Sequence, residues 1–203
     1  MIQPRLVAIP IFLILLLCSL QAAATSVLPV SLQRMAKTAE MIFHGTAIGN
    51  EVRLDQASGR VATYTSFKVI EVIKGNPGEI HTIKQIGGQL PGSNVRLVIH
   101  GVPRFAVGKE YVIFLPKASS LGFASPIGLS QGKFDIHKLN GDTLVSNGRS
   151  LAALMKTRPQ QDSPIEPSAL ASNRAPALKA IDGQPASAHL TDFMQAVRGM
   201  LNE

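Results

Sequence analysis

The chain has 203 residues, of which 45% are hydrophobic and 16% are charged. This is room for one ordinary domain with tails and argues against a two-domain cofactor enzyme. Twenty Lys and Arg against thirteen Asp and Glu give a formal net charge of +7, and there is a single cysteine. One cysteine excludes a disulfide framework and any zinc or iron–sulfur site built from clustered cysteines.

An export signal is predicted at residues 1–24. Arg5 precedes an apolar run over residues 6–20, and Ala22, Ala23 and Ala24 provide the small residues of a cleavage site. A run of about 15 apolar residues is shorter than the roughly 20 that cross a bilayer as a helix. We therefore expect cleavage after Ala24, no stable membrane span afterwards, and export to the periplasm or the extracellular space.

Cys18 lies inside this apolar run and lacks the small preceding residue that lipid attachment requires. A lipoprotein is therefore disfavoured. The processed chain is expected to contain no cysteine, so that its stability must come from packing.

A short helix and a strand are predicted at the start of the processed chain. Ser31 is followed by an apolar stripe at helical spacing, formed by Leu32, Met35, Ala36 and Ala39. Residues 41–48 are rich in strand-forming types, and residues 55–59 provide a polar turn.

The segment 60–74 predicts a long strand with a change of phase. Apolar and β-branched residues occupy alternate positions from Val61 to Val69, after which the apolar set shifts to Ile70 and Val72, with Ile73 beside them. A single change of phase is typical of a β-bulge in a strand that contributes to both sides of a small closed sheet.

Further short strands are predicted at residues 79–86, 94–99, 111–115, 131–137 and 143–145, separated by Gly- and Pro-containing turns. No helical periodicity of useful length lies between them. The expected fold is therefore mainly β: a small OB-like barrel, closed or partly open, within a domain spanning residues 25–150, with a small β-sandwich as the alternative.

The last part of the chain predicts a linker and a terminal helix. Residues 151–188 are rich in Pro, Ser and Ala, which favours a disordered linker. Residues 189–203 carry an amphipathic stripe after a capping Thr191. This helix is expected to fold back onto the domain; docking into a partner is the alternative.

Three segments of the chain can be compared with known modules: AEMIFHGT at 39–46, FKVIEVIKG at 67–75 and FAVGKEYVIFL at 105–115. Similar segments occur in the same order in netrin-like modules, the OB-type barrels that include the tissue inhibitors of metalloproteinases. Over this stretch the chain resembles that family, as do uncharacterised exported bacterial proteins with the same segments. The resemblance implies an OB-type scaffold and a disposition to bind macromolecules. Those inhibitors chelate the protease zinc through an N-terminal cysteine, which this chain lacks after cleavage, so that mechanism does not carry over.

Chemistry-bearing motifs are sparse. GLSQG at 128–132 matches the pattern of a nucleophile elbow around Ser130, and Asp142 and His189 follow in the order of a catalytic triad. The residues after it alternate like a strand rather than continuing as a helix, so a β-turn is the preferred interpretation. Five histidines are scattered singly, without metal-ligand spacing, and no phosphate-binding loop is present. We expect no metal and no cofactor.

The leading hypothesis is an exported, non-enzymatic binding or interaction protein. Its expected partner is another exported protein or an anionic component of the envelope, because the chain is basic. Nucleic acid is not expected, since the cations are dispersed and aromatics make up only 5% of residues. The alternatives are a small serine hydrolase using Ser130 and a protease-inhibitor-like module without the zinc-chelating cysteine.

Overall fold

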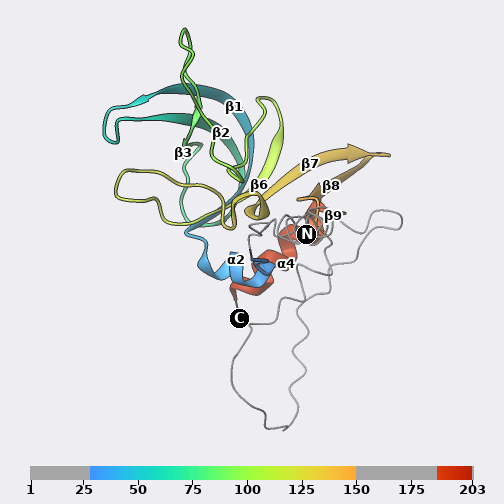
Figure 1. The fold of residues 1–203 in the computed structure, drawn as a ribbon. Coiled ribbons are helices and arrows are strands. Elements are labelled where there is room, and N and C mark those ends of the chain that lie inside the picture. Colours follow the sequence, from blue (N-terminus) through green and yellow to red (C-terminus); the bar gives the residue numbers. More distant parts are fainter. Residues whose placement is uncertain (1–27, 150–186, 203) are drawn as a thin grey trace, which may run out of the picture.

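The computed structural model describes residues 28–149 and 187–202. The predicted signal at 1–24 and residues 151–186 of the predicted linker lie outside these ranges. The described part is mainly β, as the sequence predicted: it consists of one seven-stranded antiparallel sheet, a two-stranded ribbon and two α-helices (Figure 1).

The main sheet has the order β3-β2-β1-β6-β7-β8-β9. Its strands are β1 (Met41–Asp55), β2 (Arg60–Lys74), β3 (Ile80–Ile86), β6 (Glu110–Leu115), β7 (Lys133–Leu139), β8 (Asp142–Ser146) and β9 (Ser187–His189). The ribbon pairs β4 (Gly88–Gln89) with β5 (Arg96–Leu97). The predicted strand at 94–99 is thus reduced to two residues, and the predicted strand at 131–137 begins only at Lys133.

The sheet is not closed into a barrel, because β3 stands at one end of the strand order and β9 at the other. One additional parallel bridge joins Lys84 of β3 to Phe123. Beyond it, the amide of Ala124 donates to the carbonyl of Lys84, and that of Ile127 donates to the carbonyl of Phe114 in β6, both at 2.9 Å. The segment 123–127 is therefore hydrogen-bonded to β3 and to β6.

The predicted N-terminal helix is confirmed as α2 (Leu32–Thr38). The hydroxyl of Ser31 accepts a hydrogen bond from the amide of Arg34 at 3.1 Å, which satisfies one of the free donors of the first turn. Leu32, Met35 and Ala36 are fully buried, as their spacing predicted.

The predicted change of phase in β2 is confirmed as a bulge, and the pairing register of β2 with β1 shows a second bulge in the same strand. Phe43 and His44 of β1 pair with Val72 and Glu71, whereas Gly45 pairs with Val69, so Ile70 and Ile73 each stand as an extra residue. Ile70 is 52% exposed, but Val69 and Ile73 pack into two different hydrophobic clusters. The strand therefore does contribute to two cores, although the sheet is not closed.

Two hydrophobic cores lie on either side of β6. The strand core contains Phe43, Ala47, Phe67, Ile83, Phe105, Tyr111, Ile113 and Leu115. The helix core joins α2 to the C-terminal helix and includes Val112, Phe114, Phe134, Val145 and Phe193. Residues of β6 alternate between the two cores, which explains why five consecutive residues of this strand are buried.

The C-terminal helix α4 (Leu190–Leu201) folds back onto the domain, as expected. Phe193 and Val197 are fully buried in the helix core, and α4 contacts α2 (Figure 1). The N-cap is His189, not the predicted Thr191, because residues 187–189 pair with β8 and the helix begins directly after that strand. Ser187 and Ala188, expected at the end of the linker, thus belong to the sheet. No helix in the described ranges is long and apolar enough to cross a membrane.

Candidate functional site

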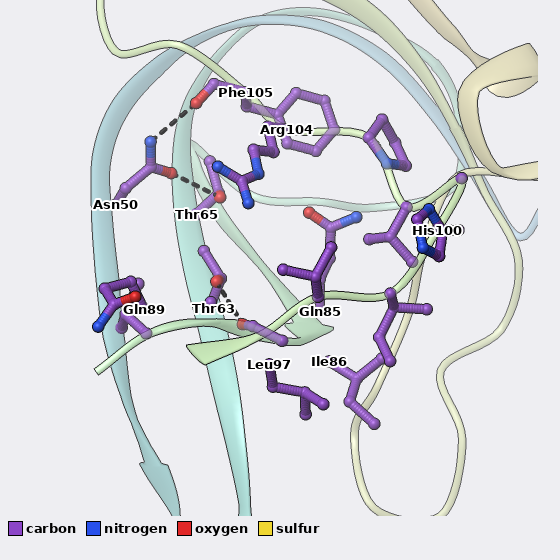
Figure 2. Close-up of a pocket in the computed structure, with 18 residues that line it drawn as sticks. Asn50, Thr63, Thr65, Gln85, Ile86, Gln89, Leu97, His100, Arg104 and Phe105 are labelled. Carbon is purple, nitrogen blue, oxygen red and sulfur yellow. Dashed lines mark hydrogen bonds between the residues drawn. The ribbon is translucent and has the colours of Figure 1, made fainter. Parts of the chain in front are cut away.

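A cleft of about 460 Å³ lies at the end of the strand core, between β1, β2 and β3 on one side and the segment 87–105 on the other (Figure 2). Its volume is within the usual range of small-molecule sites. The cleft is lined by Asn50, Val52, Thr63, Thr65, Gln85, Ile86, Gly87, Gly88, Gln89, Leu97, Val98, Ile99, His100, Gly101, Val102, Pro103, Arg104 and Phe105.

The floor of the cleft is a polar layer set on the aromatic strand core. Phe67 belongs to that core, and Thr65, two residues earlier on the same face of β2, is 1% exposed. The hydroxyl of Thr65 donates to Oδ1 of Asn50 at 2.7 Å, and Nδ2 of Asn50 donates to the carbonyl of Phe105 at 2.8 Å. Both side chains are therefore held in place by β1, β2 and the loop that precedes β6.

Gln85 of β3 lies in the same layer and differs from its neighbours. It is 3% exposed, and its Nε2 is buried without a hydrogen-bond partner among the described residues. Figure 2 shows its carboxamide rising into the space that the labelled residues surround. A buried donor left without a partner costs about 1–3 kcal/mol, so this amide is a place where a ligand atom would be stabilising.

The segment that covers the cleft is held close to the sheet by glycine. Gly88 has φ +137°, and a Cβ at this position would lie 2.6 Å from Cγ1 of Val52. The hydroxyl of Thr63 donates to the carbonyl of Gly87 at 2.7 Å. A side chain at position 88 would push the ribbon away from β1 and β2, so glycine is required for the observed shape of the cleft.

The charge in the cleft is positive. Arg104 and His100 are the ionisable residues of its lining, which contains no carboxylate. Within the described ranges neither side chain forms an ion pair, whereas Lys133 and Lys84 do. Figure 2 shows the Arg104 side chain on the same side of the cleft as Thr65. The site therefore favours neutral or anionic ligands over cations.

A buried ionic cluster fixes the corner of the sheet next to the cleft. Oδ1 of Asp55 pairs with Nζ of Lys84 at 2.6 Å and accepts from the hydroxyl of Tyr64 at 2.7 Å, while its Oδ2 accepts from Ser58. The hydrogen bonds from Lys84, Ser58 and Tyr64 hold the pKa of Asp55 well below its usual value, and Asp55 in turn raises the pKa of Tyr64. Because Lys84 precedes Gln85, this cluster also positions the cleft floor.

The structure does not assemble the triad that the GLSQG motif suggested. Ser130 is exposed on a 3-10 turn, η1 (Leu129–Gly132), rather than on the predicted β-turn or on a strand-to-helix elbow. Asp142 pairs with Leu139 at the far end of the β7-β8 hairpin, roughly 20 Å along the strand from Lys133. His189 pairs with Leu144, and within the described ranges neither Asp142 nor His189 forms a hydrogen bond with Ser130.

The five histidines do not meet. His44 contacts Glu110 at 2.8 Å, His81 packs against the ring of Phe43, His100 lies in the cleft, His137 is on β7, and His189 begins α4. Burial lowers the pKa of His81, an effect that a hydrogen bond from its ring to the backbone of Pro77 partly opposes. The described residues contain no group of three or more His, Cys, Asp or Glu placed to bind a metal ion.

Sequence reasoning missed the cleft. The available signal was a polar residue on the inward face of a strand: Thr65 follows the same alternation as Phe67, and Gln85 the same alternation as Ile83. A buried glutamine next to a buried threonine marks either a satisfied polar layer or a site, and only the hydrogen-bond geometry distinguishes them.

A comparison with models of known protein families finds no family that matches the chain, and a comparison with curated proteins finds no relative.

Proposed function

We propose that the protein is an exported, non-enzymatic binding protein, built on an OB-like barrel, whose partner enters the cleft above the strand core. The observation that carries this proposal is Nε2 of Gln85, which is buried in the floor of the cleft without a partner among the described residues, whereas the neighbouring side chains of Asn50 and Thr65 are paired. Binding is preferred to hydrolysis because, in the described ranges, Ser130 is exposed on η1 and forms no hydrogen bond with a histidine.

The path of the chain supports an OB-like arrangement. Strands β1, β2 and β3 follow one another as an antiparallel meander, and β6 returns beside β1. The segment 123–127 runs between β3 and β6 and bonds to both. If it is counted as a short fifth strand, a ring of strands surrounds the strand core, and the cleft is the open end of that ring.

The segments on which the netrin-like resemblance rests have defined structural roles. Nζ of Lys74 donates to the carbonyls of Ala36 and Lys37 at the end of α2, and Gly75 has φ +79° where a Cβ would clash with Glu40. The hydroxyl of Tyr111 accepts from the amide of Ala106 at 2.8 Å. These contacts are consistent with the proposed scaffold, and they do not depend on any cysteine.

The proposals of export and of the partner's nature rest on the sequence: the predicted signal directs the protein out of the cytoplasm, and its basic charge favours an exported protein or an anionic envelope component as partner.

A site-specific experiment tests whether that partner uses the cleft. A photo-crosslinking residue is introduced at Val98, which lines the cleft and is 46% exposed, and separately at Leu139, which is 40% exposed at the tip of the β7-β8 hairpin.

Both variants are exported in cells, irradiated and analysed by intact mass spectrometry. A discrete adduct at Val98 that is absent at Leu139 is the expected result. Equal adducts at both positions, or an adduct at Leu139 alone, would place the partner elsewhere and overturn the assignment of the cleft. An uncleaved N-terminus in the exported fraction would overturn the predicted signal.

A further inference from the structure

We propose that the cleft binds a small monocarboxylate with an apolar body. This inference rests on the proposed function, since it assigns a ligand class to the same cleft. Within the described residues it combines three features of the lining: a floor donor without an acceptor, basic side chains without an ion pair, and several aliphatic side chains in the walls.

The free donor selects an acceptor. In the polar layer, the hydroxyl of Thr65 already donates to Asn50, and Nδ2 of Asn50 already donates to Phe105. Nε2 of Gln85 is the side-chain donor of this layer that is left without an acceptor. A carboxylate oxygen placed against it would accept a charge-assisted hydrogen bond, which is stronger than a neutral one.

The charge of the cleft selects an anion. Arg104 and His100 border the same space, and none of the described residues that line it is an Asp or a Glu. Arg104 has no ion-pair partner in the described ranges, so a bound carboxylate would compensate its charge without breaking an existing contact. A cation would instead face two basic groups and an amide N–H.

The walls select an apolar body of limited size. Val52, Leu97 and Val102 line the cleft together with the ring of Phe105. A volume of about 460 Å³ is enough for a small ligand. Burial of the apolar part against these side chains provides affinity, and the carboxylate fixes the orientation.

Three probes that share one decyl chain test this assignment: decanoate, decanol and decyltrimethylammonium, each at monomeric concentration and pH 7. Binding to the processed protein is followed by calorimetry and by ¹H–¹⁵N NMR, in which the side-chain amide of Gln85 gives its own pair of signals. We expect decanoate to bind more tightly than the other two and to shift the Gln85 signals.

Two variants with a matched control locate the carboxylate. Gln85→Met removes the donor and is expected to weaken decanoate binding about tenfold or more, with decanol affected little. Arg104→Gln is expected to weaken decanoate selectively. Arg96→Gln removes the same charge from β5, outside the cleft lining, and is expected to leave decanoate affinity unchanged.

The outcomes separate this inference from the proposed function. If decanol or the ammonium probe binds as well as decanoate, or if Arg96→Gln weakens binding as much as Arg104→Gln, the carboxylate assignment is wrong while the cleft remains a binding site. If no probe binds but the Val98 adduct forms in cells, the ligand class is likewise wrong and the proposed function stands. If neither is seen, both are overturned.

Discussion

Replacing Gln85 by methionine should make the protein more stable, although the substituted side chain is buried and polar. Methionine has a similar unbranched length and fills the same space without an amide. Gln85 is 3% exposed and its Nε2 has no partner in the part of the chain that the structure describes, and such a donor costs about 1–3 kcal/mol in the folded state. Taking the lower end of that range, we expect the free energy of unfolding to rise by about 1 kcal/mol and Tm to rise by about 3 °C.

Urea unfolding followed by circular dichroism measures this change, with the m value as a check that the unfolded state is unaltered. Thr65→Val is the control in the same layer: it removes the donor to Asn50, and is therefore expected to lower stability by about 1–2 kcal/mol. Opposite signs for two neighbouring polar deletions would be hard to obtain from packing alone. A loss of 1 kcal/mol or more in Gln85→Met, at unchanged m, would show that the amide is satisfied in the folded protein and would refute the reasoning behind the site.

Four further outcomes are expected. Phe193→Asp places an unpaired charge in the helix core and should lower the free energy of unfolding by more than about 4 kcal/mol. Gln195→Asp, on the exposed face of α4, should change it by less than about 0.5 kcal/mol. Equal unfolding midpoints for the two variants would contradict the packing of this helix. Asp55→Asn should lower Tm at pH 7. Because the pKa of Asp55 is lowered in the folded state, the difference in Tm between the variant and wild type should shrink as the pH falls below about 4. A difference in Tm that does not depend on pH would argue against the ion pair. Because the pKa of His81 is lowered in the folded state, the unfolded chain takes up a proton at higher pH than the folded chain, so stability should fall as the pH drops below about 6.5. His81→Gln should reduce this dependence of Tm on pH, as measured by thermal melts at several pH values. A fluorophosphonate probe should leave Ser130 unlabelled, since in the described ranges no histidine is hydrogen-bonded to it; labelling of Ser130 would support the hydrolase hypothesis.

The elements that sequence reasoning predicted best are those whose burial is local and periodic. The stripe from Leu32 to Ala36, the turn at 55–59 and the full extent of β2 follow from spacing and turn chemistry alone. The predicted N-cap of α4 was wrong because strand pairing decides where the helix begins. β9 pairs with β8 up to His189, so the helix begins where the strand ends and Thr191 lies inside its first turn.

The segment 94–99 shows a different limit of sequence reasoning. Its alternation of polar and apolar residues is typical of a strand, but only Arg96 and Leu97 pair, with β4. Val95, Val98 and Ile99 are 52%, 46% and 38% exposed. Strand propensity describes a fit to a pleated, half-buried surface, and here Leu97, Val98 and Ile99 line a cleft instead of pairing with another long strand.

The same argument explains why the site could not be found from motifs. Its lining combines two residues each from β1, β2 and β3 with twelve from the segment 87–105, so no short pattern contains the polar floor formed by Asn50, Thr65 and Gln85. GLSQG is a short motif that resembles a catalytic one, yet its Gln131 has a structural role and joins η1 to the segment before α2. Its Oε1 accepts from the amide of Val30 at 2.9 Å, and its Nε2 donates to the carbonyl of Leu28 at 3.0 Å.

The contrast between Gln131 and Gln85 carries the interpretation of the cleft. Both are buried glutamines, at 5% and 3% exposure. The fold surrounds Gln131 with backbone partners, so its burial contributes to stability. It leaves Nε2 of Gln85 without a partner at the mouth of an aromatic core, where an aliphatic residue would pack at lower cost. A buried amide that lowers the stability of the fold is best explained by a ligand that binds to it. In Gln85→Met the free energy of unfolding should therefore rise while the affinity for decanoate falls.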